Sequence, residues 1–334
     1  MKTAVVILNW NGAVHLRRFL PSVAANTPSA DIVVADNGST DASAEAVDAI
    51  PGVRWLPLGS NYGFAGGYNR AIAALEGYDL FVLLSSDVET PAGWLEPLAA
   101  AIGDDPTVAI AAPKILSYAD RGRFEYAGAA GGYIDWFGYP FCRGRILDAV
   151  ERDTGQYDDR RRVFWASGAA LCCRADVYRS LGGFCEGFFA HMEEIDLCWR
   201  AQLCGYGVEA VPESRVYHLG GGTLANGSAR KIYLNHRNNL AMLYRCAPPV
   251  QRCVVAFVRP LLDAAAALGY LLGGNAKGFA AVFAAYRDFV RMHPRLRRER
   301  RAIRGAAKQE SHYIYKGMIL LRYLVGLRRF DKMM

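Results

Sequence analysis

The sequence predicts an α/β fold: a mixed sheet flanked by helices and followed by a C-terminal helical extension. Short β-rich runs alternate with helical segments up to about residue 112, and this alternation is typical of a parallel sheet with helices on both faces. The chain has 334 residues, of which 52% are hydrophobic and 21% charged. It can therefore bury a large core, and its composition excludes a disordered chain.

The expected elements follow one another along the chain. Strands are predicted at residues 4–8, 31–35, 53–57, 79–84 and 107–112. Helices are predicted between them at residues 14–26, 41–50, 65–75 and 91–103. Residues 115–165 are rich in aromatic residues, glycines and charges, and we expect loops and hairpins there. A weaker alternation then predicts a strand at 171–173, helices at 175–181 and 190–204, and a strand at 208–211.

The last part of the chain differs from the rest in charge and in periodicity. Residues 1–250 carry a net charge of −5, whereas residues 251–334 carry +12. Apolar residues in this basic part follow helical spacing, and the stretch 254–273 is nearly long enough to span a bilayer. Arg259 and Asp263 interrupt that stretch, and charges are costly inside a membrane. We therefore expect a helix that lies in the plane of an anionic membrane surface.

Two alternatives remain for this basic region. It could form a helical cap that packs on the rest of the chain, or its charges could form a solvated face without a partner. Because apolar residues separate the arginines, lipid is favoured over nucleic acid, and we expect no nucleic-acid partner.

Polar residues after the first three predicted strands suggest a ligand site. Asp36 ends an apolar run and is followed by Asn37-Gly38, a turn-forming pair. Asn9-Trp10-Asn11-Gly12 follows the first strand, and its spacing excludes a dinucleotide-binding fingerprint. The segment Asn61–Asn69 contains glycines that let the backbone approach a ligand closely. Open α/β sheets bind ligands at the carboxyl ends of their strands.

Two further segments carry residues that suit a divalent cation and a general base. Asp87 follows the fourth predicted strand, and His218 lies just past a later strand, beside three glycines. Glu193, Glu194 and Asp196 fall at a predicted helix start, where the helix dipole would lower a carboxyl pKa and keep a base ionised at neutral pH. Taken alone, each of these residues also fits a purely structural role. Acids are common in the first turn of a helix, and a lone histidine is more often structural than a ligand.

The order of these segments resembles the family-2 inverting glycosyltransferases with the GT-A fold, a Rossmann-like mixed sheet, and particularly their rhamnosyltransferase-like branch. The resemblance runs from Val5 to about Asn239. It includes the opening Val6-Ile-Leu-Asn-Trp-Asn-Gly12 and the Asn-x-Gly-Phe-Ala-x-Gly-x-Asn segment at 61–69. It continues through Ser85-Ser86-Asp87 in place of the family's Asp-x-Asp element.

The resemblance assigns a role to each matching residue. Asp36 would bind the nucleoside, Asp87 and His218 would hold Mg²⁺ or Mn²⁺, and the Glu193-Glu194 pair would carry the catalytic base. The candidate catalytic residues are therefore Glu194, Glu193 and Asp196. The candidate donor-binding residues are Asn9, Asn11, Asp36, Asn37, Asn61, Gly63, Gly66, Gly67, Asn69 and Ser86. The candidate acceptor-side residues are Gly168, Phe184 and Arg237, the last within the family's Arg-Asn pair.

Three departures from the family pattern bear on the chemistry. The Asp-x-Asp element keeps only Asp87, so metal binding would depend more on His218. Glu194 stands where aspartate is usual, and the longer side chain can still act as a base. Cys185 replaces the usual acid after Gly-Gly-Phe, which removes a local hydrogen bond.

The resemblance implies transfer of a sugar, with rhamnose as one candidate, from a UDP- or dTDP-sugar to a hydroxyl of a saccharide or polyprenyl-linked acceptor in cell-surface polysaccharide synthesis. The catalytic domain would comprise residues 1–245 and the amphipathic, basic region residues 246–334. With eight scattered cysteines and no signal-peptide pattern, we expect a cytoplasmic protein, peripheral on the inner face of the cell membrane. The alternative is a catalytically inactive protein of the same fold that binds a sugar nucleotide or saccharide.

Overall fold

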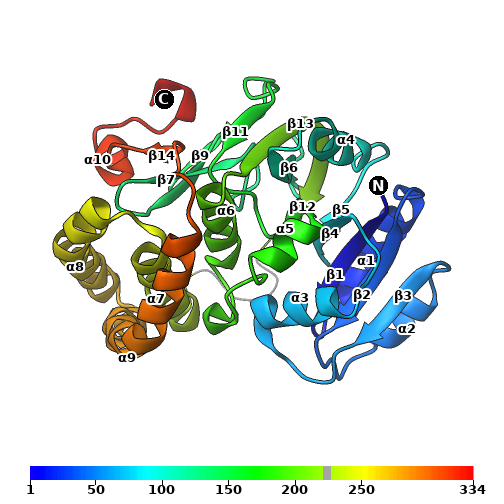
Figure 1. The fold of residues 1–334 in the computed structure, drawn as a ribbon, viewed down its shortest axis with the longest axis horizontal. Coiled ribbons are helices and arrows are strands. Elements are labelled where there is room, and N and C mark those ends of the chain that lie inside the picture. Colours follow the sequence, from blue (N-terminus) through cyan, green and yellow to red (C-terminus); the bar gives the residue numbers. More distant parts are fainter. Residues whose placement is uncertain (221–226, 334) are drawn as a thin grey trace.

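The computed structural model describes residues 1–220 and 227–333. In this part of the chain, nine strands form one mixed sheet with the order β11-β13-β6-β12-β4-β1-β2-β3, with β5 paired to β13. Five short strands form a second sheet in the order β10-β9-β8-β7-β14. Figure 1 shows β1–β3 at one end of the molecule, helices α7–α9 at the other, and α6 between them. The predicted mixed α/β fold with C-terminal helices is confirmed.

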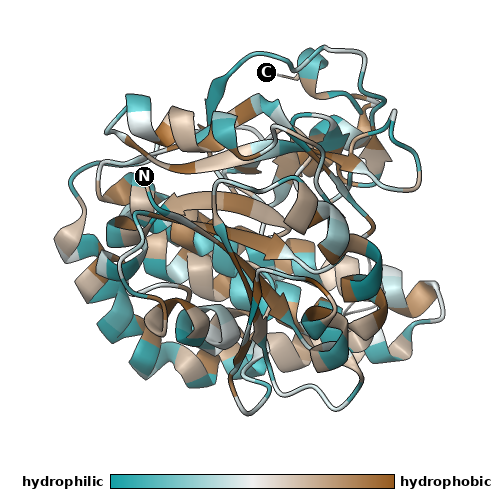
Figure 2. Cartoon of the chain, turned by 90° about the vertical axis from the view of Figure 1, so that its right-hand side faces the viewer, coloured by the Kyte–Doolittle hydropathy of each residue, from teal (hydrophilic) through white to brown (hydrophobic). Residues whose placement is uncertain are grey.

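The first half of the large sheet is parallel. Its strands are β1 (Thr3–Asn9), β2 (Asp31–Asp36), β3 (Val53–Pro57) and β4 (Leu80–Ser85). Helices α1 (Ala13–Ala25), α2 (Ser43–Asp48), α3 (Gly63–Ala73) and α4 (Glu96–Asp104) connect and cover them. The β1–β2 register pairs Asn9 with Asp36, so both polar residues lie at the same edge of the sheet. In Figure 2 the central strands are largely brown, and teal gathers on the surrounding helices and loops.

The second half of the large sheet mixes directions. Its strands are β5 (Val88–Glu89), β6 (Val108–Ser117), β11 (Arg161–Val163), β12 (Ala170–Arg174) and β13 (Gly207–His218). β12 runs antiparallel to both β4 and β6, whereas β13 runs parallel to β6. The prediction ended the last strand at 211, but β13 continues along β6 to His218 after a register shift between Val211 and Arg215. His218 is therefore a strand residue.

The glycine-rich region after β6 forms the second sheet, in agreement with the hairpins expected there. It contains β7 (Gly132–Asp135), β8 (Pro140–Cys142), β9 (Arg145–Ile146) and β10 (Ala149–Val150). Strand β14 (Ile314–Tyr315), from the C-terminal part of the chain, pairs with β7. The C-terminal part thus extends a sheet built from the middle of the chain.

Helix α6 carries the acidic cluster. It follows α5 (Ala175–Ser180) and the 3₁₀ turn η1 (Glu186–Phe188), and it spans Glu193–Leu203. The prediction began this helix at residue 190, but Phe189, His191 and Met192 have positive φ angles of 67°, 70° and 72°. A right-handed helix cannot pass through such residues, so α6 begins at Glu193.

The C-terminal helices pack on the rest of the chain. They are α7 (Ala229–Cys246), α8 (Pro249–Leu272), α9 (Ala276–Ala306) and α10 (Ile319–Leu324), with the turn η2 (Phe330–Lys332). α9 lies along α7, and side chains of α8–α10 and η2 join the hydrophobic cluster that includes the sheet. This packing corresponds to the helical cap, one of the alternatives that the sequence left open. It does not test membrane binding.

Helix α8 turns its charged side inward and its apolar side outward. Arg259 and Asp263 are 2% and 1% exposed and form an ion pair 3.2 Å long. Arg259 also donates to the Phe137 carbonyl at 2.7 Å. In contrast, Phe257 and Leu261 are 79% and 73% exposed. By length and composition alone, Pro249–Leu272 could cross a membrane.

The buried Arg259–Asp263 pair provides a test of how α8 is held. Arg259→Ala would leave the Asp263 carboxylate buried without its guanidinium, and we expect unfolding to become easier by about 3 kcal/mol. Urea denaturation monitored by circular dichroism measures this change. The control Arg298→Ala removes an exposed arginine of α9 and should stay within about 0.5 kcal/mol of the wild type. Equal stability of the two variants would contradict this account of α8.

Candidate active site

The end of strand β1 and the end of strand β2 share a hydrogen-bonded carboxylate. Asn9 donates from Nδ2 to Asp36 Oδ1 at 3.2 Å, and the Ser39 amide donates to Asp36 Oδ2 at 2.9 Å. Asn9 and Asp36 are both buried, and Asn9 Oδ1 has no partner among the described residues. The site therefore offers an oriented carboxylate and an unsatisfied acceptor at the sheet edge. A side chain at Gly12 would collide with Asn9 and approach Ser86, so Ser86 lies beside this pair.

The other predicted donor-side amides extend this network. Asn11 has a φ of 50°, and its Oδ1 accepts from the Thr40 amide at 2.7 Å. Asn37 donates from Nδ2 to Asn61 Oδ1 at 3.2 Å and to the Gly63 carbonyl at 3.0 Å. Side-chain bonds between loops that follow different strands hold those loops at one edge. The structure thus brings Asn9, Asn11, Asp36, Asn37 and Asn61 together.

The glycines of the following segment permit close packing. A side chain at Gly67 would collide with Leu8 of β1, and one at Gly63 would collide with the Phe189 ring. A side chain at Gly66 would crowd Tyr62 and Arg70. Glycine at these positions lets α3 approach both β1 and the segment before α6.

Asn69 serves a different purpose from the donor contact expected of it. Its Oδ1 accepts from the Phe184 amide at 2.9 Å and from the Tyr178 hydroxyl at 2.8 Å, and its Nδ2 donates to the Phe184 carbonyl at 2.9 Å. Its amide is thereby engaged on the turn around Phe184. These contacts join α3 to that turn, so the side-chain amide of Asn69 is not free to face a ligand.

Strand pairing brings Asp87 next to His218. The short strand β5 pairs with the end of β13, and this pairing sets Val88 opposite His218. The Leu219 amide also donates to the Asp87 carbonyl at 3.0 Å. As a result Asp87 Oδ1 lies 3.2 Å from His218 Nε2, and both side chains are largely buried. Two predicted ligands that are far apart in the sequence therefore face each other.

The spacing of Asp87 and His218 fits a divalent cation. Neighbouring ligands on an octahedral ion with bonds of about 2.1 Å are about 3 Å apart. The described residues contain no cluster of three or more His, Cys, Asp or Glu side chains arranged for a metal. Two protein ligands suit an ion that takes its remaining ligands from phosphate oxygens and water.

Glu125 is a neighbour of His218 that the sequence did not indicate. Its Oε2 lies 3.4 Å from His218 Nδ1, on the other side of the ring from Asp87. Burial opposes a charge on His218, but the Asp87 and Glu125 carboxylates outweigh it and raise the pKa of His218 to about 10. A carboxylate behind a ligating histidine fixes its tautomer and orientation. Glu125 lies in an irregular segment, with no motif to identify it.

Glu193 and Glu194 present unsatisfied carboxylates at the start of α6. One oxygen of each, Oε2, is buried without a partner among the described residues. Burial raises the pKa of Glu194 to about 7 and that of Glu193 well above its usual value, and the neighbouring carboxylates raise Glu193 further. The sequence predicted a lowered pKa from the helix N-terminus. The backbone hydrogen bonds there do act in that direction, but burial outweighs them.

Tyr68 links the acidic cluster to the Asp87 region. Its hydroxyl, on α3, donates to the Leu84 carbonyl of β4 at 3.1 Å. Burial raises the pKa of Tyr68, and the charges of Asp87 and Glu193 raise it further. Tyr68 therefore lies within electrostatic range of both carboxylates, one near the sheet edge and one at the start of α6.

The segment before α6 is held by side chains of α7. Asn238 donates to three carbonyls, those of Phe188, Ala190 and His191, at 3.0, 2.8 and 2.8 Å. Arg237 donates to the Phe188 carbonyl at 3.0 Å and to that of Gly187 at 2.9 Å. These bonds hold the residues with positive φ and so position Glu193 and Glu194. Arg237, expected on the acceptor side, supports the backbone behind the site.

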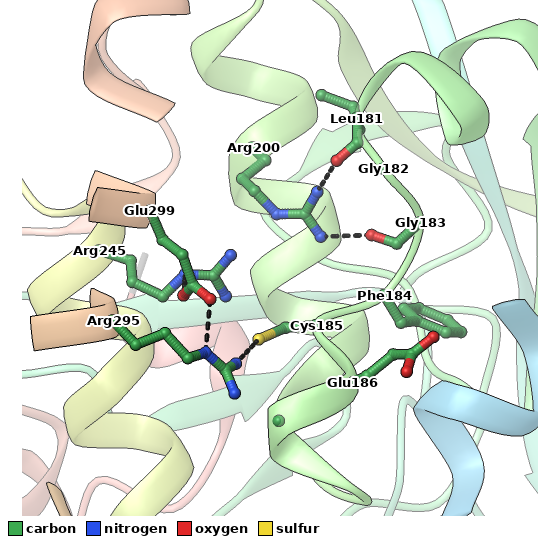
Figure 3. A pocket seen from close by; sticks show the side chains of 11 residues that line it. Leu181, Gly182, Gly183, Phe184, Cys185, Glu186, Arg200, Arg245, Arg295 and Glu299 are labelled. Atoms are coloured by element: carbon green, nitrogen blue, oxygen red, sulfur yellow. Dashed lines mark hydrogen bonds and ion pairs between the residues drawn. The ribbon is translucent and has the colours of Figure 1, made fainter. Parts of the chain in front are cut away.

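Asp196 points away from the other two acids. Its two oxygens accept from Arg200 at 2.7 Å and from Arg245 at 2.8 Å, and it is completely buried. Figure 3 shows Arg200 and Arg245 reaching into a pocket with Arg295 and Glu299 from α9. Both oxygens of Asp196 are engaged by guanidinium groups, whereas Glu193 and Glu194 each keep an oxygen without a partner among the described residues. Of the three predicted acids, the structure therefore favours Glu193 and Glu194 over Asp196 as proton acceptors.

Two predicted acceptor-side residues have packing roles. Phe184 is buried, and its ring centroid lies 5.9 Å from that of Phe64 and 5.6 Å from that of Tyr178. A side chain at Gly168 would crowd Phe64 and approach Glu194. These two positions therefore shape the floor next to Glu194. The structure shows neither as a freely exposed contact.

His191 is a second residue that the sequence reasoning missed. Its Nε2 is buried without a partner among the described residues, two positions before Glu193. Burial and the charge of Lys231 lower the pKa of His191 to about 4, so the imidazole is neutral at physiological pH. A neutral imidazole can both donate and accept a hydrogen bond. In the sequence, the one indication of a role for His191 was its position in the segment Phe188–Glu194, just before the acidic residues.

Comparison with known proteins identifies the family that the chain resembles. Residues 4–151 match the family described as Glycosyl transferase family 2. The chain is 29% identical, over 255 residues, to the N-acetylglucosaminyl-diphospho-decaprenol L-rhamnosyltransferase of Mycobacterium tuberculosis strain H37Rv, covering 72% of this chain and 83% of the relative. The chain belongs to glycosyltransferase family 2. Within that family, the chain is similar to the rhamnosyltransferase-like branch.

Solved structures show the same fold for this glycosyltransferase. S. aureus TarS 1-349 in complex with UDP-GlcNAc matches with a TM-score of 0.57 at 16% identity, over 92% of this chain and 87% of that one. GalNAc-T7 with UDP, GalNAc and Mn²⁺ matches with a TM-score of 0.57 at 20% identity. That match covers 73% of this chain but about half, 48%, of the neighbour. These likenesses establish the GT-A fold.

Glu125 provides a test of the cation site at Asp87 and His218. In Glu125→Gln the imidazole loses the carboxylate that orients it, and we expect affinity for Mn²⁺ to fall about 10- to 100-fold. Electron paramagnetic resonance of free Mn²⁺ in a titration measures this directly. Glu76→Gln, at an exposed glutamate, is the control and should bind as the wild type does. Unchanged affinity in Glu125→Gln would remove Glu125 from the site.

Proposed function

We propose that this glycosyltransferase moves a sugar, with inversion, from a nucleoside diphosphate sugar to a hydroxyl of a saccharide or lipid-linked saccharide acceptor. The observation that carries the proposal is the buried Glu194 carboxylate, one oxygen of which has no partner among the described residues. The facing pair of Asp87 and His218, and the oriented Asp36 carboxylate at the sheet edge, support it. The donor is a UDP- or dTDP-sugar, and rhamnose is the sugar suggested by the Mycobacterium tuberculosis relative. That relative's name also supports a lipid-linked acceptor in cell-surface polysaccharide synthesis.

Glu194 acts as the general base in this proposal. Its pKa of about 7 leaves a substantial ionised fraction at neutral pH and makes it a stronger base than an ordinary carboxylate. It would accept the acceptor hydroxyl's proton as that oxygen attacks the anomeric carbon. Beside it, burial and the neighbouring carboxylates raise the pKa of Glu193 well above its usual value. Asn238 and Arg237 keep the backbone before α6 fixed, which holds the base in position.

The donor side is organised by the network at the sheet edge. Asp36 is oriented by Asn9 and by the Ser39 amide, so its carboxylate is placed to accept hydrogen bonds from the nucleoside. Asp87 and His218 would hold Mg²⁺ or Mn²⁺, and a bound cation would neutralise the charge that develops on the departing diphosphate. Two solved neighbours contain Mn²⁺ in their complexes, which supports this choice of metal.

The exposed side of α8 supports a place for the enzyme on a membrane. Charged residues of α8 face the protein, and a stripe of apolar side chains faces outward. The stripe consists of Val250, Val254, Phe257, Leu261, Leu268, Leu271 and Leu272. Such a face suits the interfacial region of an anionic bilayer, with the arginines of α9 nearby. We propose that residues 246–334 dock the catalytic domain, residues 1–245, on the cytoplasmic face of the cell membrane.

The base is tested by Glu194→Gln. The amide keeps the shape of the side chain but cannot accept the proton, so turnover should fall about 10²- to 10⁴-fold while the affinity for the donor stays unchanged. Turnover is measured as release of the nucleoside diphosphate, and affinity by calorimetry. Wild-type activity in this variant would move the base to Glu193.

The pH profile of the wild type is the second readout of the same test. Glu194 must be ionised to act, so the rate should decline as the pH falls through about 7. The acid limb should be absent from the residual activity of Glu194→Gln. Asp196→Asn serves as the comparison: it should lower stability through its arginine partners without removing the acid limb.

Membrane docking is tested by Phe257→Ser combined with Leu261→Ser. Both side chains are exposed, so folding should be unaffected, while binding to vesicles that contain phosphatidylglycerol should weaken at least about tenfold through lost apolar burial. Val14→Ser, an exposed apolar residue of α1 at the opposite end of the molecule, is the control. Equal binding by the double variant and the control would refute docking through α8. Truncation near residue 250 is unsuitable, because α9 packs on α7.

A further inference from the structure

A second hollow in the C-terminal region is lined almost entirely by arginines. It has a volume of about 350 Å³ and lies where the end of α7, the start of α8 and the last turns of α9 meet. Its wall contains Tyr244 and the guanidinium groups of Arg252, Arg297, Arg300, Arg301 and Arg304. We refer to it as the arginine pocket. It takes no part in the donor or base chemistry described above.

The positive charge of the arginine pocket is largely uncompensated. Arg304 pairs with Glu310. Within residues 1–220 and 227–333 the other four arginines of the pocket have no acidic partner in an ion pair. Burial and the charges of Arg252 and Arg304 lower the pKa of Arg300, which shows that like charges are held close together. Convergent guanidinium groups that outnumber the carboxylates beside them form a site for an anion.

Three of the five arginines are already held by the fold, among them Arg304, which donates to the Cys246 carbonyl at 3.3 Å and pairs with Glu310. Arg300 donates to the carbonyls of Tyr244 and Ala247 at 2.8 Å each, at the end of α7. Arg252 stacks over the Tyr244 ring, with its guanidinium carbon 5.5 Å from the ring centroid. Arg297 and Arg301, in contrast, are exposed and make no hydrogen bond or ion pair in the described part of the chain. The pocket thus has a rigid floor and two side chains free to close on a ligand.

The neighbouring pocket of Figure 3 shows what a structural arginine cluster looks like in this protein. There Arg200 and Arg245 share Asp196, and Arg295 pairs with Glu299 at 2.6 Å. Charge in that pocket is balanced by acids that belong to the protein. In the arginine pocket Arg304 alone has such an acid among the described residues, Glu310, so the other four arginines are not explained by an internal network of that kind.

The position of the arginine pocket identifies the kind of anion. Pro249 lines the pocket, and the next residue, Val250, is 70% exposed and begins the apolar stripe of α8. A ligand with a phosphate head and a hydrocarbon tail would place its charged group among the arginines and its tail along α8. A nucleic acid offers phosphates but nothing for the apolar stripe to contact.

We propose that the arginine pocket binds the phosphate or diphosphate headgroup of a membrane lipid, next to the apolar stripe of α8. This inference rests on the proposed membrane docking and adds a specific site to it. Guanidinium groups bind phosphate oxygens in pairs, so phosphate monoesters and diphosphates, with several free oxygens, suit five arginines best. The pocket would bind the same class of lipid that carries the proposed acceptor, and this binding would keep the enzyme on the membrane.

The experiment compares two double variants of the full chain. Arg297→Gln with Arg301→Gln removes the two free arginines of the pocket, and Arg291→Gln with Arg298→Gln removes two exposed arginines of α9 outside it. Sedimentation with phosphatidylcholine vesicles containing phosphatidic acid measures binding. We expect the pocket pair to bind at least about tenfold more weakly than the control pair, because it loses directed contacts as well as charge.

Each other outcome of this experiment overturns the proposal in a specific way. Equal losses in the two double variants would mean diffuse surface charge without a site. Displacement from the vesicles by inorganic pyrophosphate at the concentration of the lipid phosphate would mean a site for a soluble anion. Tighter binding to a single-stranded oligonucleotide than to the vesicles would mean a nucleic-acid site.

Measurements on the same preparations separate this proposal from the proposed function. If the wild type binds no vesicles at all, membrane docking itself is wrong. If both double variants keep wild-type release of nucleoside diphosphate while the pocket pair alone loses vesicle binding, the pocket is confirmed as a lipid site apart from the chemistry. If the pocket pair loses donor turnover instead, the pocket belongs to the catalytic site and the proposal fails.

Discussion

The pairing of β5 with the end of β13 is the constraint on which the candidate active site depends. It is only two residues long on the β5 side, yet it sets Asp87 against His218, and the β4–β5 turn thereby meets a strand from the second half of the chain. Glu125 completes the arrangement from the hairpin region, on the far side of the imidazole. Three chain segments therefore meet at one ring. A buried histidine between two carboxylates is stable as a cation, and the same geometry is suited to a metal ion.

Placement of the proposed base depends on a second constraint, the hold of α7 on the residues before α6. The single Asn238 amide donates to the carbonyls of Phe188, Ala190 and His191, in a segment where Phe189, His191 and Met192 have positive φ angles. Such sparsely populated conformations persist only where surrounding contacts hold them. Phe189 also accepts from the first amides of α3, at 2.7 and 3.2 Å, so the donor-side helix and the base segment are hydrogen-bonded to each other. The C-terminal helices support this assembly through α7 and α9. The proposed membrane face and the proposed catalytic residues thus belong to one packed body.

Much of the fold could be predicted because periodicity and strand-end polarity are local properties. The runs before Asp36 and Asp87 became β2 and β4, and the polar residues after them lie at the expected sheet edge. Glu125 could not be predicted, since it lies in an irregular segment where no spacing repeats. Asp196 was counted among the candidate catalytic acids because spacing along a helix says which residues share a face but not which neighbour that face meets. Its neighbours are Arg200 and Arg245, and the second comes from a different helix.

The sequence alone determined the order of strands and helices, the family resemblance and the basic, apolar character of the final 85 residues, because each of these is written in neighbouring residues. Only the tertiary structure decided how α8 is turned, with Arg259 and Asp263 inward and its apolar stripe outward, and which of the three acids of α6 remain unpaired. It also raised the pKa of Glu194 where the helix start alone would lower it. The physical reason is the same in each case: burial and partner choice arise from contacts between distant segments, and these exist only once the chain has folded.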